Sequence, residues 1–228
     1  MKQHVLLLAG LFASAATFAQ SKTAETGKPS VSIRAGASSA SITGDASQGL
    51  NDLVDYSNGI FKTQSKLGVF AGASVNIPLG GNISVEPGLY YDQKGYMLKG
   101  SYDFKGIASI ISPSAKAELN QHYISLPVLV KGNFNGFEVF AGPQVSYLAK
   151  SDLHVTAGAL GFNAYNDRFN TADQFNKIDV GLLGGVGYQF ANGFNIRAAY
   201  DRGLTKVDAN RNMDAYNQAF KVGVGFRF

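Results

Sequence analysis

Apolar and polar residues alternate with a period of two along most of the chain after residue 30. In the first run Val31, Ile33 and Ala35 share one face, while Ser32 and Arg34 lie on the other. Side chains of a β-strand point alternately to opposite faces, so each such run predicts a strand. Eight runs carry the pattern: residues 31–38, 67–77, 83–94, 124–134, 137–150, 178–190, 194–201 and 220–228.

The connections between these runs alternate between short and long. Short ones fall at Pro78–Asn82, Asn135–Gly136 and Asn192–Gly193. The two Asn-Gly pairs are typical of type I′ hairpin turns, whose central residues both need a positive φ. Long connections are expected at residues 40–65, 97–121, 151–177 and 207–217. This layout predicts an all-β fold, an eight-stranded antiparallel transmembrane β-barrel with short periplasmic turns and long extracellular loops.

The first 20 residues have the features of a secretory signal peptide. Lys2 and His4 precede an apolar run from Val5 to Phe18, and small residues Thr17 and Ala19 suit a cut before Gln20. The expected division is a signal peptide at 1–19, a flexible lead-in at 20–30 and the barrel at 31–228. Because no later stretch is apolar enough for a spanning helix, membrane insertion would require a closed barrel, and the expected location is the outer membrane.

The two faces of the strands differ in a way that suits a membrane barrel rather than a soluble lipocalin-like one. Six basic and five acidic residues on the polar faces are predicted to form ion pairs in the lumen: Arg34, Lys94, Lys131, Arg197, Lys221 and Arg227 with Glu86, Asp92, Glu138, Asp179 and Asp201. Aromatic residues on the apolar faces are predicted to form two girdles, although ordinary strand aromatics are the alternative. They are Phe134, Phe137, Phe190, Phe194 and Phe228 at the short-turn rim, and Tyr91, Tyr147 and Tyr200 nearer the long loops.

The last strand ends the chain with apolar residues at every second position. These residues are Phe220, Val222, Val224, Phe226 and Phe228. They are interpreted as the terminal signal that the barrel-assembly machinery reads. Outer-membrane lipids are the other expected contact.

The composition excludes several kinds of functional site. The chain has no cysteine, which excludes thiol nucleophiles and cysteine metal sites. Its net charge is only +4, or about +3 without Lys2 in the leader, and no basic cluster favours nucleic acid. Cofactors and resident metals are not expected.

A few residues could still carry chemistry near the long-loop rim. His122 or His154 could form a rim site with loop Asp and Ser residues, although surface histidines without a role are favoured. Asp208, Asn210, Asn212 and Asp214 alternate as in a calcium loop, but Met213 and Ala219 replace the expected Gly and Glu. Loop aromatics could contact a partner, pack the loops together or rest on lipid headgroups. They are Tyr102, Phe104, Phe162, Tyr165, Phe169 and Tyr216.

Several segments together resemble a known family. They are Ser84–Gly95, Tyr123–Lys131, Val139–Leu148, Asp179–Phe190, Arg197–Thr205 and Phe220–Phe228. In that order they resemble the outer-membrane β-barrel proteins of Bacteroidota, called porin-family or PorT-like, whose eight-stranded fold is like that of OmpA and OmpX. Ser125 departs from the pattern, since many members carry Glu there. The resemblance implies a fold and no shared enzymatic activity.

The functional expectation is a non-enzymatic integral outer-membrane barrel whose long loops serve structural, binding or adhesion roles. Eight strands leave an interior that side chains can fill, so no general diffusion pore is expected. Possible partners are other envelope proteins or an extracellular ligand. The alternatives are a small porin-like channel, an outer-membrane component of a secretion or transport assembly and, least favoured, a membrane enzyme with a site at the rim.

Overall fold

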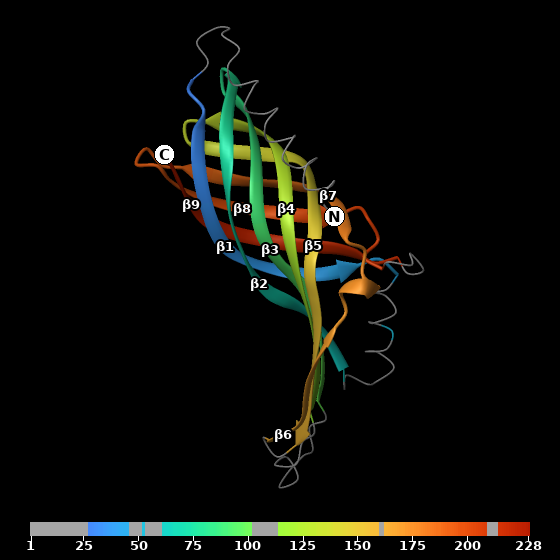
Figure 1. The fold of residues 1–228 in the computed structure, drawn as a ribbon. Helices are drawn as coiled ribbons and strands as arrows, with labels where there is room; N and C mark the ends of the chain where they lie inside the picture. Colours follow the sequence, from blue (N-terminus) through green and yellow to red (C-terminus); the bar gives the residue numbers. More distant parts are fainter. Residues whose placement is uncertain (1–26, 46–51, 53–60, 102–113, 160–161, 209–213) are drawn as a thin grey trace.

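A ring of eight antiparallel strands forms the body of the protein (Figure 1). The computed structural model describes residues 27–45, 52, 61–101, 114–159, 162–208 and 214–228. The predicted signal peptide and most of the predicted lead-in therefore lie outside the described residues. No helix among the described residues is long and apolar enough to cross a membrane.

Nine strands make up the sheet, and eight of them close the ring. The strands are β1 Ser30–Thr43, β2 Phe61–Gly80, β3 Ile83–Ser101, β4 Ser114–Phe134, β5 Phe137–Ala159, β6 Phe162–Asn170, β7 Ile178–Gln189, β8 Phe194–Gly203 and β9 Tyr216–Arg227. Neighbours pair in chain order except that β5 pairs with β7, and β9 pairs with β1 to close the ring. The predicted eight-stranded barrel is thus confirmed, and the ninth strand, β6, pairs with β5 alone among the strands that the structure describes.

The prediction of loops at 97–121 and 151–177 is wrong for many of these residues. Strands β3 and β4 stay paired out to Ser101 and Ser114, and β5 continues into a hairpin with β6. A single turn of 3-10 helix, Ala172–Gln174, follows β6. Instead of loops, paired strands run past the ring.

We call this part the extension and define it as residues 61–65 of β2, 96–101 of β3, 114–120 of β4, 151–159 of β5 and all of β6. In Figure 1 it reaches to the lower end of the molecule, where β6 is labelled. Its five strands remain paired, from Phe61↔Gly100 at one side to Ala159↔Phe162 at the other, with a register shift between Ala157 and Gly158. The extension is therefore a sheet with two edges, whereas the ring has none.

The tight turns gather at the opposite end of the ring from the extension. Asn135 has φ 53° and Gly136 has φ 92°, as a type I′ turn requires. The second Asn-Gly pair also lies in a short hairpin connection, residues 190–193, but its predicted type I′ turn is wrong because Gly193 has a positive φ and Asn192 does not. The amide of Gly193 closes it by donating to the carbonyl of Phe190 at 3.2 Å. The C-terminus lies at this same end (Figure 1).

Candidate functional site

The ring is apolar outside and charged inside. Outward residues such as Leu67, Val130 and Val224 are 75%, 57% and 59% exposed, while Glu86, Asp92 and Lys94 are at most 2% exposed. Strand alternation produces this, because each strand turns every second side chain into the lumen. The interior is therefore the main concentration of buried charge among the described residues.

Five charged residues form a cluster on the side of the tight turns, which we call the turn-side cluster: Arg34, Glu86, Lys131, Glu138 and Arg197. Glu86 is its centre. Its carboxylate accepts from Arg197 at 2.7 and 2.8 Å and lies 2.9 Å from the Lys131 ammonium and 3.3 Å from Arg34. Glu138 accepts from Arg197 Nε at 2.9 Å and pairs with Lys131 at 3.2 Å. With three cations and two carboxylates, this cluster has a formal charge of +1.

A second group, the loop-side cluster, lies toward the extension: Asp92, Lys94, Asp179, Asp201 and Lys221. Lys94 pairs with Asp201 at 3.0 Å and Asp179 at 3.5 Å. Lys221 pairs with Asp92 at 2.7 Å and Asp201 at 3.2 Å. Two cations and three carboxylates give this cluster a formal charge of −1, so the two clusters together balance.

Apolar side chains separate the two clusters. Leu129, Phe140 and Leu183 pack together in the lumen, and Phe70 and Tyr90 contact each other with ring centroids 6.5 Å apart. The guanidinium of Arg197 lies 4.7 Å from the Phe140 ring centroid, and the ammonium of Lys221 lies 5.7 Å from that of Phe70. A cavity of about 50 Å³ remains among them, room for a few water molecules and for no larger solute.

Glycine makes the room that these rings need. A Cβ added to Gly36 would come 2.1 Å from the carbonyl oxygen of Val222 and 2.8 Å from the Phe70 ring. At Gly184, by contrast, the nearest atoms would be 3.6 Å away, an ordinary contact. Phe70 therefore fills the lumen because the strand positions opposite it lack side chains.

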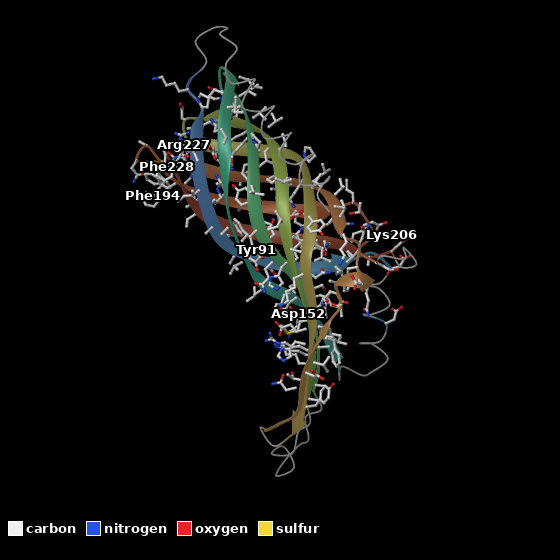
Figure 2. The ribbon with its side chains drawn as sticks, viewed as in Figure 1. Tyr91, Asp152, Phe194, Lys206, Arg227 and Phe228 are labelled. Atoms are coloured by element: carbon white, nitrogen blue, oxygen red, sulfur yellow. The ribbon has the colours of Figure 1, made fainter. Side chains whose placement is uncertain are left out.

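Ten of the eleven predicted lumen charges occupy these two clusters, and Arg227 does not. Arg227 lies beside Phe194 and Phe228 at the tight-turn end (Figure 2) and makes no ion pair with any residue that the structure describes. Without it the interior holds five basic and five acidic side chains.

Neutral polar residues complete the network, and the sequence pattern did not single them out. Gln144 donates to Asp201 at 2.9 Å, and Asn217 donates to Asp179 at 3.0 Å and to the Tyr123 hydroxyl at 3.2 Å. Arg34 donates to the Tyr90 hydroxyl at 2.6 Å and to Asn195 at 3.3 Å. Their only signal in the sequence is an inward position on a strand.

The predicted girdle residues all lie on the outside of the ring, 36% to 70% exposed. Figure 2 places Phe194 and Phe228 at the tight-turn end and Tyr91 nearer the extension. Phe226 links Phe194 and Phe228, with ring centroids 5.2 and 5.0 Å away. In the terminal strand, Phe220, Val222 and Val224 are also exposed outward, at 53% to 59%.

A polar group that includes Asp152, labelled in Figure 2, surrounds His122 where the strands leave the ring. The Tyr91 hydroxyl hydrogen-bonds to His122 Nδ1 at 2.5 Å, and Asp152 Oδ1 lies 3.9 Å from Nε2. Burial lowers the pKa of His122, and Lys150 and Lys66 lower it further against the opposing effect of Asp152. The imidazole is therefore neutral at neutral pH.

This rim group does not form a hydrolytic triad within the described part of the chain. No described Ser or Thr hydroxyl hydrogen-bonds to His122, and His154 bonds to the amide oxygen of Asn166 at 2.7 Å. The described residues also contain no group of three or more His, Asp or Glu that could hold a metal. Of the calcium candidates, Asp214 pairs with Lys206, while Asn210 and Asn212 lie outside the described residues.

Some of the predicted loop aromatics are described by the structure and others lie outside the described residues. Tyr165 and Phe169 are 46% and 44% exposed on β6, and Tyr216 lies 6.0 Å from the Arg202 guanidinium. Tyr102 and Phe104 lie outside the described residues, as does the side chain of Phe162.

Solved structures of bacterial surface barrels are similar to this chain at low identity. Neisserial surface protein A is 14% identical with a TM-score of 0.46, covering 87% of this chain and 97% of its own. Ail of Yersinia pestis, solved with the heparin analogue sucrose octasulfate, is 12% identical with a TM-score of 0.45, covering 88% and 99%. OprG of Pseudomonas aeruginosa is 14% identical with a TM-score of 0.39, covering 87% and 95%. No curated protein matches.

The family is decided by a match to a family model rather than by these structures. The model described as outer membrane protein beta-barrel domain matches residues 18–209, most of the chain. The match agrees with the closed ring, the charged lumen and the apolar exterior. This chain belongs to the outer membrane protein β-barrel domain family, and its location is the outer membrane.

Proposed function

We propose that this protein is a closed, non-conducting and non-enzymatic barrel that holds its extension outside the cell to bind a partner. The observation that carries the proposal is the contrast between a filled lumen and five strands that continue beyond it. In this orientation the tight turns and the C-terminus face the periplasm, and the extension faces outward. The even number of strands in the ring supports this orientation, because it brings the start of β1 and the end of β9 to the same rim.

The lumen argues against a channel. A solute would have to pass both ion-pair clusters and the apolar layer between them, and the cavity there measures only about 50 Å³. The ion pairs, at 2.7 to 3.5 Å, would have to separate, and this would leave buried charges without partners at a cost of several kcal/mol. Planar-bilayer recording on the purified chain should show no steady conductance, and large stable openings would favour the small porin-like channel instead.

The extension supplies the surface for binding. All described side chains of β6 are exposed, and among the described strands β6 is paired on one side only. Long structured segments beyond a scaffold commonly carry function. The partner we expect is another envelope protein or an extracellular ligand.

Crosslinked pull-down from intact cells tests this role. One variant replaces residues 154–168 by Asn-Gly, which preserves the Leu153↔Phe169 pair as the last of the hairpin. A second replaces residues 97–118 by Asn-Gly and preserves Tyr96↔Leu119. Heat-dependent migration on gels confirms that each barrel folds. We expect partners to be lost from at least one variant, and recovery of the same partners by both would leave a purely structural barrel as the better account.

A further inference from the structure

The outward face of the extension is basic, and it continues the lipid-facing surface of the ring. On β4 the outward positions change from Val130, Val128 and Ile124 to His122, Asn120, Glu118 and Lys116. On β5 they change from Val145 and Tyr147 to Lys150, Asp152 and His154. The same strands therefore pass from an apolar band to a polar, cation-rich one without a break.

Cations outnumber anions on this face. The described side chains include five cations, Lys66, Lys99, Lys116, Lys150 and Arg168, and two anions, Glu118 and Asp152. Lys116 and Lys66 pair with Glu118, and Lys150 pairs with Asp152 at 3.3 Å. Lys99 and Arg168 are exposed and make no ion pair with a described residue. Five positive and two negative charges leave a formal excess of +3.

Strand register places like charges side by side here. Lys99 on β3 lies directly opposite Lys116 on β4. Like charges at such positions destabilise a sheet unless a counter-charge is present. This pair of lysines on adjacent strands is therefore a place where a bound polyanion would stabilise the fold.

The spacing of the cations indicates how large that anion is. Lys150 lies opposite His122, two residues past the Ile124–Tyr147 pair or about 7 Å, and Lys116 is eight residues past Ile124, about 26 Å. A phospholipid headgroup layer is only about 5–7 Å thick. The cations thus start at the edge of the lipid-facing band and continue well beyond such a layer, as the charged sugar head of a glycolipid would.

We propose that the outward face of the extension binds the anionic head of an outer-leaflet glycolipid, with its phosphates and acidic sugars on Lys150, Lys116 and Lys99 and its acyl chains on the adjoining apolar face of β4 and β5. The argument rests on charge complementarity and on continuity with the lipid-facing ring. It holds whether or not the extension also binds a protein.

Binding of a labelled glycolipid to the full chain in zwitterionic detergent tests the proposal. The probe is a lipopolysaccharide that carries only its phosphorylated core, compared with the same glycolipid after dephosphorylation and with its core oligosaccharide freed of acyl chains. We expect the intact probe to bind at least about tenfold more tightly than either form. Equal binding of the dephosphorylated form would overturn the role of the anions, and equal binding of the free oligosaccharide would overturn the role of the lipid.

Charge variants locate the site. Lys99→Gln, Lys116→Gln and Lys150→Gln together should weaken binding by about tenfold or more. The matched control, Lys28→Gln, Lys177→Gln and Lys206→Gln, removes the same charge elsewhere and should leave binding unchanged. Glu118→Gln frees Lys66 and Lys116 and should tighten binding, a gain that a misfolded variant would not show. Equal losses in both triple variants, or weaker binding by Glu118→Gln, would overturn the assignment.

Discussion

The ring and the extension are made from the same strands yet use charge in opposite ways. Inside the ring, Glu86 is 2% exposed and contacts three cations from three other strands. On the extension, Lys99 and Arg168 are exposed, and Lys99 lies directly opposite another lysine, Lys116. Charges buried in pairs fix one arrangement of the ring, whereas exposed and unbalanced charges leave a surface available to an anion.

Breaking the turn-side cluster should have the largest effect. Glu86→Gln removes the carboxylate that Arg34, Lys131 and Arg197 share and leaves those cations with Glu138 alone. Stability should fall by about 3–5 kcal/mol, the cost of an uncompensated buried charge. Urea unfolding of the refolded barrel in detergent micelles measures it.

The control for that experiment lies on the extension. Glu118→Gln also removes a carboxylate that contacts two lysines, but one of them, Lys116, is 39% exposed, so its cost should be well below that of Glu86→Gln. Equal losses for the two variants would contradict the distinction between ring and extension.

Crowding of the lumen should have the next largest effect. Gly36→Ala brings a methyl group against the Val222 carbonyl and Phe70, and should cost about 1–3 kcal/mol. Gly184→Ala, with its nearest contacts at 3.6 Å, should be close to neutral. The same unfolding assay compares them, and a neutral Gly36→Ala would mean that the strands around Phe70 can move apart.

Loss of the last residue tests assembly rather than stability. Deleting Phe228 removes the exposed end of the apolar series on β9, and we expect less protein in the outer-membrane fraction. Phe194→Ala, which removes a neighbouring ring outside the terminal strand, is the control. Immunoblots of membrane fractions measure both, and an unchanged level after the deletion would refute a terminal assembly signal.

Removing the β5–β6 hairpin should have the smallest effect on the ring. Because β6 pairs with β5 alone among the described strands, the Asn-Gly replacement of residues 154–168 leaves every ring pairing in place. Stability should change by about 1 kcal/mol or less, as for other surface changes. A large loss would show that the extension supports the ring.

The sequence predicts the ring well because alternation marks it directly. Lumen residues such as Lys131 and Glu138 could be placed on the inner face from their position alone. Their partners could not be predicted, since Glu86 and Arg197 are 111 residues apart and meet only through the closure of the ring. Arg227 follows the same alternation but lies at the open end of the strand, where nothing in the pattern separates it from a lumen charge.

The extension was missed although its signal is present. Leu153, Val155 and Ala157 alternate with Asp152, His154 and Thr156, as strand residues do. Frequent polar residues and the expected length of a membrane strand favoured loops there. Strands β3, β4 and β5 have 19 to 23 residues, more than a membrane requires. A strand length inferred from membrane thickness cannot predict this excess.

The bond between Arg34 and Asn195 joins residues 161 positions apart, on the first strand and the eighth. These two side chains can meet only after β9 has paired with β1, whatever the order in which the other strands join the sheet. A half-built sheet would thus present the lumen charges to whatever surrounds it. Such a chain should enter the bilayer only as its two end strands meet, which makes closure of the seam and insertion a single event.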